Sequence, residues 1–238
     1  RGDEDFWVVK VDASGNKVWD KRFGGTERDA CYSVVASSDG AYLLAGISFS
    51  AANGDKSEGT RGGSDYWVVK IDANGAKLWD KRFGSSGWDW LHRVVVSNDG
   101  GYLLAGTNLA GEGGEKTEAS RGNWDYWVVK LDANGTKVWD KRFGGTKKDD
   151  CKSVVATSDG GYLLAGNSES GKNGDKSEWT RGRHDYWAVK IDAAGGKVWD
   201  KSFGGTSDDI CESIVATHEG GYLLSGYSWS AVNDDSSE

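Results

Sequence analysis

The sequence aligns with itself in rows of sixty residues without a gap, and this internal repeat constrains the fold more than any other feature. Twenty-three of the sixty columns hold the same residue in every row. A repeat of this length is usually one supersecondary unit that cannot bury its apolar face alone. We therefore expect a single domain, residues 1–238, in which four like units pack on one another. The repeats cover residues 1–60, 61–120, 121–180 and 181–238.

Each repeat contains four short runs rich in β-branched and aromatic residues, which in the third repeat are 125–132, 137–143, 153–157 and 162–166. Asp-Ala-Asn-Gly separates the first two runs and Ser-Asp-Gly-Gly the last two, and such sequences are strong hairpin signals. No run has a helical period, and 36 glycines interrupt the chain too often for helices to propagate. The sequence predicts an all-β protein with sixteen strands.

Four-stranded units repeated around an axis make a β-propeller, in which each sheet is covered by its neighbours. The strand at 126–131 is apolar on both faces, as expected for a sheet packed on both sides. A solenoid is the alternative, but it needs polar, atypical end repeats, and the first and last copies here are as regular as the others. We therefore favour a propeller of four four-stranded blades.

Two phrases of the repeat resemble the bacterial β-propeller repeats known as SBBP repeats, over the whole chain: Ser-Val-Val-Ala-x-Ser-Asp-Gly-x-Tyr-Leu-Leu-Ala-Gly and Asp-Tyr-Trp-Val-Val-Lys-x-Asp-Ala-x-Gly. Asp-Ala-x-Gly-x-Lys-Val-Trp is similar to the tryptophan-docking motif of quinoprotein propellers, and the Leu-Leu-Ala-Gly cadence resembles WD repeats. The resemblance implies that Ser-Val-Val-Ala is the innermost strand and Lys-Val-Trp-Asp-Lys the outermost. It says little about function.

By that strand order the chain begins with a third and a fourth strand, near residues 6–23, and ends with a first and a second, near residues 213–226. We expect these N-terminal and C-terminal strands to pair in one blade and to close the ring. The alternative is that the chain is part of a larger ring.

In an up-and-down blade the two tight turns share one rim and the two long connections share the other. Function is usually placed on such loops. Eight of the thirteen tryptophans recur in strand columns, and we expect them in the core: Trp7, Trp67, Trp127, Trp187, Trp19, Trp79, Trp139 and Trp199. The other five lie in or beside the long loops, where they either pack locally or contact a ligand: Trp88, Trp90, Trp124, Trp179 and Trp229.

The longer loop repeats a polar motif that begins at Asn53-Gly-Asp-Lys-Ser-Glu and is followed by an arginine. Carboxylates, amides and cations beside indoles suit a hydroxyl-rich ligand, although internal salt bridges would explain the same residues. The copy at 233–238 lacks the lysine, so we expect it to be the weakest site. The predicted ligand-binding residues are Asn53, Asp55, Lys56, Glu58, Arg61, Glu115, Lys116, Glu118, Arg121, Asn173, Asp175, Lys176, Glu178, Arg181, Trp88, Trp124, Trp179 and Trp229.

Two invariant aspartate columns precede strands, and we interpret them as structural acceptors for backbone N–H groups: Asp5, Asp65, Asp125 and Asp185, and Asp29, Asp89, Asp149 and Asp209. The cysteines Cys31, Cys151 and Cys211 share one column, and Leu91 stands there in the second repeat. We expect small buried hydrophobic residues there rather than a disulfide.

Catalysis has little support in the sequence. His92, His184 and His218 fall in different columns, so no general base or histidine metal site is repeated. Phosphate-loop, zinc-protease and hydrolase motifs are absent. The pair Asp149 and Asp150 could serve glycoside hydrolysis, but four-fold repetition suits binding better than one active centre. We predict no enzyme, no cofactor and no metal.

A net charge of −8 argues against nucleic acid as a partner, and the apolar runs are too short for membrane insertion. Our leading hypothesis is a secreted, extracellular lectin, in which repeated weak sites bind glycans or glycoproteins with avidity. Oligomer formation is left open. The alternative is a protein-interaction scaffold or adhesin segment without sugar binding.

Overall fold

The computed structural model describes residues 2–109 and 113–231, and within them the chain forms only strands, turns and loops. Sixteen strands, four from each repeat, confirm the predicted all-β class. The strands are β1 (Phe6–Val11), β2 (Lys17–Phe23), β3 (Asp29–Ala36), β4 (Tyr42–Ser48), β5 (Asp65–Ile71), β6 (Lys77–Phe83), β7 (Trp88–Val96), β8 (Tyr102–Leu109), β9 (Trp124–Leu131), β10 (Lys137–Phe143), β11 (Asp149–Ala156), β12 (Tyr162–Ser168), β13 (Asp185–Ile191), β14 (Lys197–Phe203), β15 (Asp209–Ala216) and β16 (Tyr222–Ser228).

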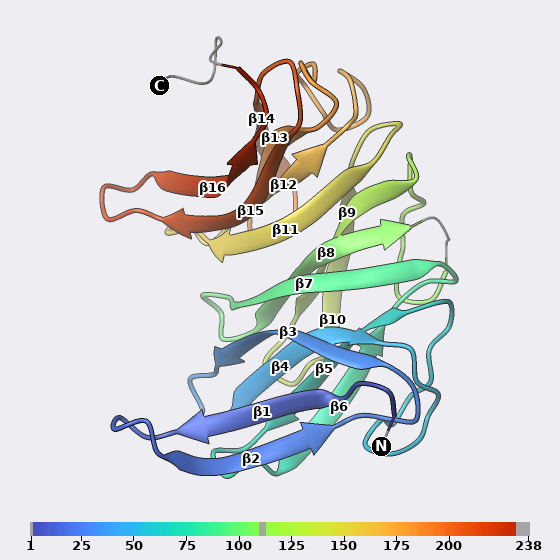
Figure 1. The fold of residues 1–238 in the computed structure, drawn as a ribbon, viewed down its shortest axis with the longest axis vertical. Helices are drawn as coiled ribbons and strands as arrows, with labels where there is room; N and C mark the ends of the chain where they lie inside the picture. The colour runs from blue at the N-terminus through green and yellow to red at the C-terminus, as the bar shows by residue number, and fades with distance from the viewer. Residues whose placement is uncertain (1, 110–112, 232–238) are drawn as a thin grey trace.

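The strands form three complete antiparallel sheets, each with four strands in chain order: β3 to β6, β7 to β10, and β11 to β14. Each complete sheet takes the last two strands of one repeat and the first two of the next. The remaining strands form two-stranded sheets, β1 with β2 at one end of the molecule and β15 with β16 at the other (Figure 1). The sheets therefore follow one another along an arc.

Aspartate and glycine form the tight turns that the sequence predicts. The Asp72 carboxylate accepts the N–H groups of Asn74 and Ala76, each at 2.8 Å. Gly75 has a φ of 81°, a conformation in which a Cβ atom is disfavoured. The same turn recurs after β1, β9 and β13. Because strand direction alternates, all tight turns share one rim, and the long loops share the other.

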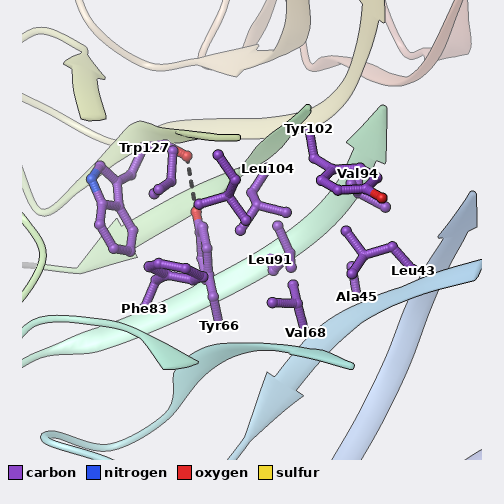
Figure 2. Close-up of a cluster of buried hydrophobic side chains, with 12 residues drawn as sticks. Leu43, Ala45, Tyr66, Val68, Phe83, Leu91, Val94, Tyr102, Leu104 and Trp127 are labelled. Carbon is purple, nitrogen blue, oxygen red and sulfur yellow. Dashed lines mark hydrogen bonds between the residues drawn. The ribbon is translucent and has the colours of Figure 1, made fainter. Parts of the chain in front are cut away.

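Consecutive sheets pack face to face on apolar side chains. Between the first two complete sheets, Tyr66 and Phe83 of one sheet pack near Leu91 and Trp127 of the next (Figure 2). The Tyr66 hydroxyl donates to the backbone carbonyl of Trp127 at 2.9 Å, and Tyr126 makes the same bond to Trp187. The first strands β3, β7, β11 and β15 contact one another in sequence. They therefore lie at the inside of the arc, as in propeller blades.

Within residues 2–109 and 113–231, the expected pairing of the terminal strands in one blade is not formed. There β16 pairs only with β15 and β1 only with β2, at opposite ends of the arc (Figure 1). The reason is the step between sheets: each sheet packs on the next through a filled core cluster, and these repeated steps do not bring the two ends together.

The cysteines behave as the sequence predicts. All three thiols are free, and Cys151 and Cys211 are fully buried. Leu91, which replaces cysteine in the second repeat, is also fully buried. Burial raises the pKa of Cys211 to about 12, so this thiol stays protonated and acts as a small apolar side chain.

Candidate binding site

The invariant aspartates hold the bases of the long loops, as predicted. Asp149 accepts the Gly145 N–H at 2.7 Å and the Ser170 hydroxyl at 2.8 Å. Burial raises the pKa of Asp149 to about 6, and that of Asp89 likewise. In the other column, Asp65 accepts the Arg61 N–H at 2.9 Å. These carboxylates are structural acceptors beneath the rim.

The lysines of the predicted ligand-binding motif point inward. Lys56, Lys116 and Lys176 are only 3–4% exposed. The Lys56 ammonium donates to the Ser50 carbonyl at 2.9 Å, and Lys116 donates to Asn108 and Ser120. Burial lowers the pKa of Lys56 to about 8. Lys116 and Lys176 thus connect the loop to the strand residues Asn108 and Ser202. Lys56 connects it to the segment that follows β4.

The acidic residues of the same motif form ion pairs with arginines. Arg82 lies 3.2 Å from Glu58 and 3.4 Å from Glu115, and Arg61 lies 2.9 Å from Glu115. The Glu115 carboxylate also accepts the Gly84 N–H at 3.1 Å. The internal salt bridges that the sequence left as an alternative are therefore present.

The next repeat keeps this arrangement. Asp175 takes the place of Glu115, with Arg121 at 2.7 Å and Arg142 at 3.2 Å, and Glu118 lies 3.3 Å from Lys141. The side-chain amide of Asn53 donates to Thr26, and that of Asn173 accepts from the Thr146 N–H. The Asp55 carboxylate accepts from the Gly24 N–H. The fourth copy of the motif, 233–238, lies outside the described residues.

One cavity on the long-loop rim joins several predicted residues. Glu178, Trp179 and Arg181 line a cavity of about 530 Å³ together with Lys201. The Trp179 side chain is 69% exposed, and the Lys201 ammonium lies 2.6 Å from the Glu178 carboxylate. An indole, a carboxylate and a guanidinium meet there.

The other predicted tryptophans stand apart from this cavity. Trp88 packs edge-on against Phe49, with ring centroids 5.6 Å apart. Trp229 packs edge-on against Tyr227 at 5.0 Å and remains 64% exposed. Trp124 is half-buried at the start of β9 and lines a different hollow.

That hollow belongs to a groove over the first strands, on the long-loop rim. Two cavities of about 240 and 190 Å³ adjoin there and share Lys148, Asp150 and Lys152. We call their combined lining the inner groove. It consists of Trp90, His92, Thr107, Trp124, Lys148, Asp150, Lys152, Asn167, His184, Ile210, Glu212 and Tyr227.

Asp150 is the electrostatic centre of the inner groove. Its carboxylate lies 2.9 Å from the Lys152 ammonium and 3.7 Å from that of Lys148, and it accepts the Thr107 hydroxyl at 2.8 Å. Burial acts to raise the pKa of Asp150, but Lys152 and His92 outweigh it and hold the pKa below its ordinary value. Burial and Lys152 lower the pKa of His92 to about 4. At neutral pH the groove therefore has two cations, one carboxylate and a neutral imidazole around this point.

Aromatic rings form one end of the inner groove. Trp90 on β7 and Trp124 on β9 line the same cavity, from the first and third strands of one complete sheet. The Trp90 indole nitrogen is buried and has no hydrogen-bond partner among the described residues. An unpaired buried donor is costly, so this nitrogen is suited to an acceptor supplied by a bound molecule.

Every residue of the inner groove falls in one of five repeat columns, and in each of these columns all four repeats differ. The neighbouring positions on the first strand, such as Asp149 and Cys151, face the opposite side and are buried. The five columns read Glu4, Ser64, Trp124 and His184; Arg28, Trp88, Lys148 and Asp208; Ala30, Trp90, Asp150 and Ile210; Tyr32, His92, Lys152 and Glu212; and Ile47, Thr107, Asn167 and Tyr227.

The site predicted from the sequence lies on the rim that also carries this groove, but it includes only Trp124 from the groove lining. Most of the predicted ligand-binding residues recur between repeats, whereas the groove is built where the repeats differ. The signal that would have found it is the column variation itself. We regard the inner groove as the strongest candidate site, because it joins aromatic, cationic and acidic groups in one hollow.

The acidic pair Asp149 and Asp150 lies at the start of β11. Successive residues of a strand face opposite sides, so Asp149 and Asp150 do not converge on one substrate position. In residues 2–109 and 113–231, no group of three or more histidine, cysteine, aspartate or glutamate side chains is placed to hold a metal ion. The same part of the chain contains no helix long and apolar enough to cross a membrane.

Comparison with known proteins gives limited similarity. No protein-family model matches the chain. It is 26% identical over 185 residues to the regulatory protein FlaEY of Caulobacter vibrioides, a match that covers 72% of this chain and 19% of FlaEY. The chain thus spans about a fifth of that relative. No family assignment follows from this identity.

Two solved structures align with most of the chain at TM-scores below 0.5. A protein of unknown function from Bacteroides caccae aligns with a TM-score of 0.47 and 13% identity, over 93% of this chain and 65% of the other. The Pan2 WD40 domain of Neurospora crassa aligns with a TM-score of 0.47 and 12% identity, over 92% of this chain and 66% of the other. In both cases this chain spans less than two thirds of the solved chain.

Proposed function

We propose that this protein is an interaction scaffold that binds a polypeptide segment in the inner groove. The observation that carries the proposal is that the groove is confined to five repeat columns, in each of which all four repeats differ. Repeats that keep their packing residues and vary every groove residue build one asymmetric surface, not four copies of one site. An asymmetric partner with varied side chains, such as a polypeptide, suits that surface.

The groove chemistry indicates what the segment contains. Trp90 and Trp124 supply the large aromatic surfaces that dominate binding energy at protein interfaces. Lys148 and Lys152 both lie near the Asp150 carboxylate, and Glu212 lines the second cavity. A carboxylate from the partner would bind beside the two ammonium groups. We propose an apolar anchor residue followed by an acidic residue. The relative FlaEY is named a regulatory protein, which agrees with a function based on binding.

Selection of a displayed peptide library on the immobilised 238-residue chain tests this proposal. Enriched peptides are expected to pair an apolar anchor with an acidic residue. Trp124→Ala is expected to weaken their binding by about 30-fold, the effect of losing a hot-spot residue. Trp179→Ala is the matched control, because Trp179 is exposed on the same rim but outside the groove, and binding should then change less than about twofold. Peptide affinity that is unchanged by Trp124→Ala would contradict the proposal, provided that both variants unfold at the wild-type temperature.

A second candidate function is carbohydrate binding, which the cavity of Glu178, Trp179 and Arg181 supports. An indole face beside a carboxylate and a guanidinium suits the C–H surface and hydroxyl groups of a sugar. In this proposal the protein is a secreted lectin that binds glycans or glycoproteins through repeated loops. A glycan array separates the two functions: sugar binding that Trp179→Ala removes and Trp124→Ala leaves unchanged favours the lectin, whereas no bound sugar at millimolar concentration rules it out.

A further inference from the structure

In the described part of the chain, each two-stranded end sheet has one strand with a partner on one side only, although its equivalents in the complete sheets are paired on both sides. β16 pairs only with β15, and β1 pairs only with β2. In the complete sheets the corresponding second and third strands pair along their whole length. The open edge of β16 is therefore the edge at which β4, β8 and β12 pair with a strand of the β1 type.

Four apolar side chains on four different strands are exposed at these ends, although their repeat equivalents are buried. Trp7 is 65% exposed, whereas Trp67, Trp127 and Trp187 are 0% exposed. Leu223 is 62% exposed, whereas the same column in β4, β8 and β12 is at most 1% exposed. Val34 at 57% and Phe203 at 45% follow the same rule, with equivalents at 6% or less. One missing sheet contact accounts for all four exposures.

The β1–β2 hairpin is already shaped for that contact. Its Phe6 ring packs on Trp67 with centroids 4.7 Å apart, as Tyr66 packs on Trp127 at 4.7 Å. The Trp7 indole donates to Asp20 at 3.3 Å, as Trp67 donates to Asp80 at 3.1 Å. No refolding of the hairpin is needed before a strand joins it.

We propose that β16 of one molecule pairs with β1 of a second copy, so that the two end sheets complete a four-stranded sheet. The second copy is favoured over the same chain because the two edges lie at opposite ends of the arc (Figure 1). Closure within one chain would have to change the packing between the complete sheets, including the bond from Tyr66 to the Trp127 carbonyl. A head-to-tail joint leaves that packing intact. Repeated head-to-tail joints close into a ring or extend into a filament, depending on the rotation between copies.

The internal repeats supply the contacts of this joint. The register of β12 and β13 places Gly166 opposite Trp187 and Leu164 opposite Val189, so Gly226 would lie opposite Trp7 and Leu224 opposite Val9 of the second copy. Tyr186 stands where Tyr66 and Tyr126 bond to the carbonyls of Trp127 and Trp187. Its hydroxyl would bond to the Trp7 carbonyl of the second copy.

The joint also has a specific ion pair. In each complete sheet a lysine of the third strand lies 2.7–2.9 Å from an aspartate in the turn between the first two strands: Lys70 with Asp39, Lys130 with Asp99, and Lys190 with Asp159. The corresponding residues at the ends are Lys10 on β1 and Glu219 in the turn before β16. They would pair across the two copies.

Sedimentation equilibrium over a range of concentrations tests the proposal on the 238-residue chain. We expect reversible association, and Val9→Asp should raise the dissociation constant at least about tenfold, because it places a charge against the incoming strand. Val18→Asp is the control, since the Val18 column is exposed in every repeat, and it should leave association unchanged. Lys10→Glu and Glu219→Lys should each weaken association roughly twofold to fivefold, and an equimolar mixture of the two should restore it.

Cross-linking distinguishes two copies from one. Lys10→Cys and Glu219→Cys proteins, mixed and treated with a short thiol cross-linker, should give a covalent dimer. A chain that stays monomeric at all concentrations overturns the proposal. It is also overturned if a chain with both changes cross-links only within itself, since β1 and β16 then belong to one closed ring.

Discussion

The three complete sheets and the two end sheets are built from the same sixty-residue repeat, yet they present different surfaces. In β5, β9 and β13 the third-strand tryptophan is fully buried between sheets, whereas Trp7 on β1 is 65% exposed. The local sequence around each tryptophan is nearly the same. Burial in this protein is thus a property of the neighbouring sheet and not of the strand, and stability should follow the neighbours.

Replacement of equivalent tryptophans tests this difference between complete and end sheets. It is expected to give the largest change in the free energy of unfolding. Trp127→Ala removes a side chain that packs between two complete sheets and should lower the free energy of unfolding by ~3–5 kcal/mol. Trp7→Ala should lower it by less than ~1 kcal/mol in dilute solution. Urea unfolding measures both. Equal losses would show that Trp7 is buried in the isolated chain.

The pH dependence of the free energy of unfolding tests a buried carboxylate inside the complete sheets. Burial raises the folded pKa of Asp149 from 3.8 to about 6, so folding favours the protonated acid. Its contribution is fully present below pH 4 and is lost as the pH rises through 6, by about 2–3 kcal/mol. Asp149→Asn should remove this part of the decline between pH 4 and pH 6. An unchanged slope of unfolding free energy against pH would contradict the assignment.

The tyrosine hydroxyl groups that bond between sheets predict a smaller difference in the free energy of unfolding. Tyr126→Phe leaves the buried Trp187 carbonyl without its 2.9 Å donor and should cost ~1–2 kcal/mol. The Tyr186 hydroxyl has no hydrogen bond to any residue in the described part of the chain, so Tyr186→Phe should cost less than ~0.5 kcal/mol in dilute solution. Thermal unfolding at low protein concentration compares the two variants.

The smallest expected difference concerns one ion pair that occurs in both kinds of sheet. Lys77 lies 2.8 Å from Asp80, which is buried, whereas Lys17 lies 2.9 Å from Asp20, which is exposed. Lys77→Met should cost ~1 kcal/mol because Asp80 loses its cation inside the protein. Lys17→Met should cost at most ~0.5 kcal/mol. Chemical unfolding of both variants checks this, and a larger loss for Lys17→Met would reverse the comparison.

The fold was largely predictable from the sequence because its local signals repeat four times. The residue types of turns such as Asp72 to Gly75 predict the turn geometry. The apolar residues that recur in the strand columns predict which strand positions are buried. The pairing of β1 with β16 was not predictable in the same way. It depends on the angle between packed sheets, which contacts such as Tyr66 on Trp127 decide and no single repeat encodes.

The candidate site was only partly predictable. The long-loop rim followed from strand alternation, but the recurring charges were assigned to ligand binding, and the structure turns many of them inward. The Lys56 and Arg82 columns keep the same residue in three of the four repeats, and the buried members of these columns support the loops from inside. The inner groove lies instead at columns such as that of Trp90, Asp150 and Ile210, where support is not required and the side chain is free to vary.

Amide hydrogen exchange at several protein concentrations tests the central claim most directly, because it compares equivalent strands in one sample. At the lowest concentration the free-edge amides of β1 and β16 should exchange rapidly, while those of β5 and β12 are protected. As concentration rises, protection of β1 and β16 should increase together towards that of the complete sheets. Full protection of both strands at the lowest concentration would contradict the account, and so would rapid exchange at every concentration.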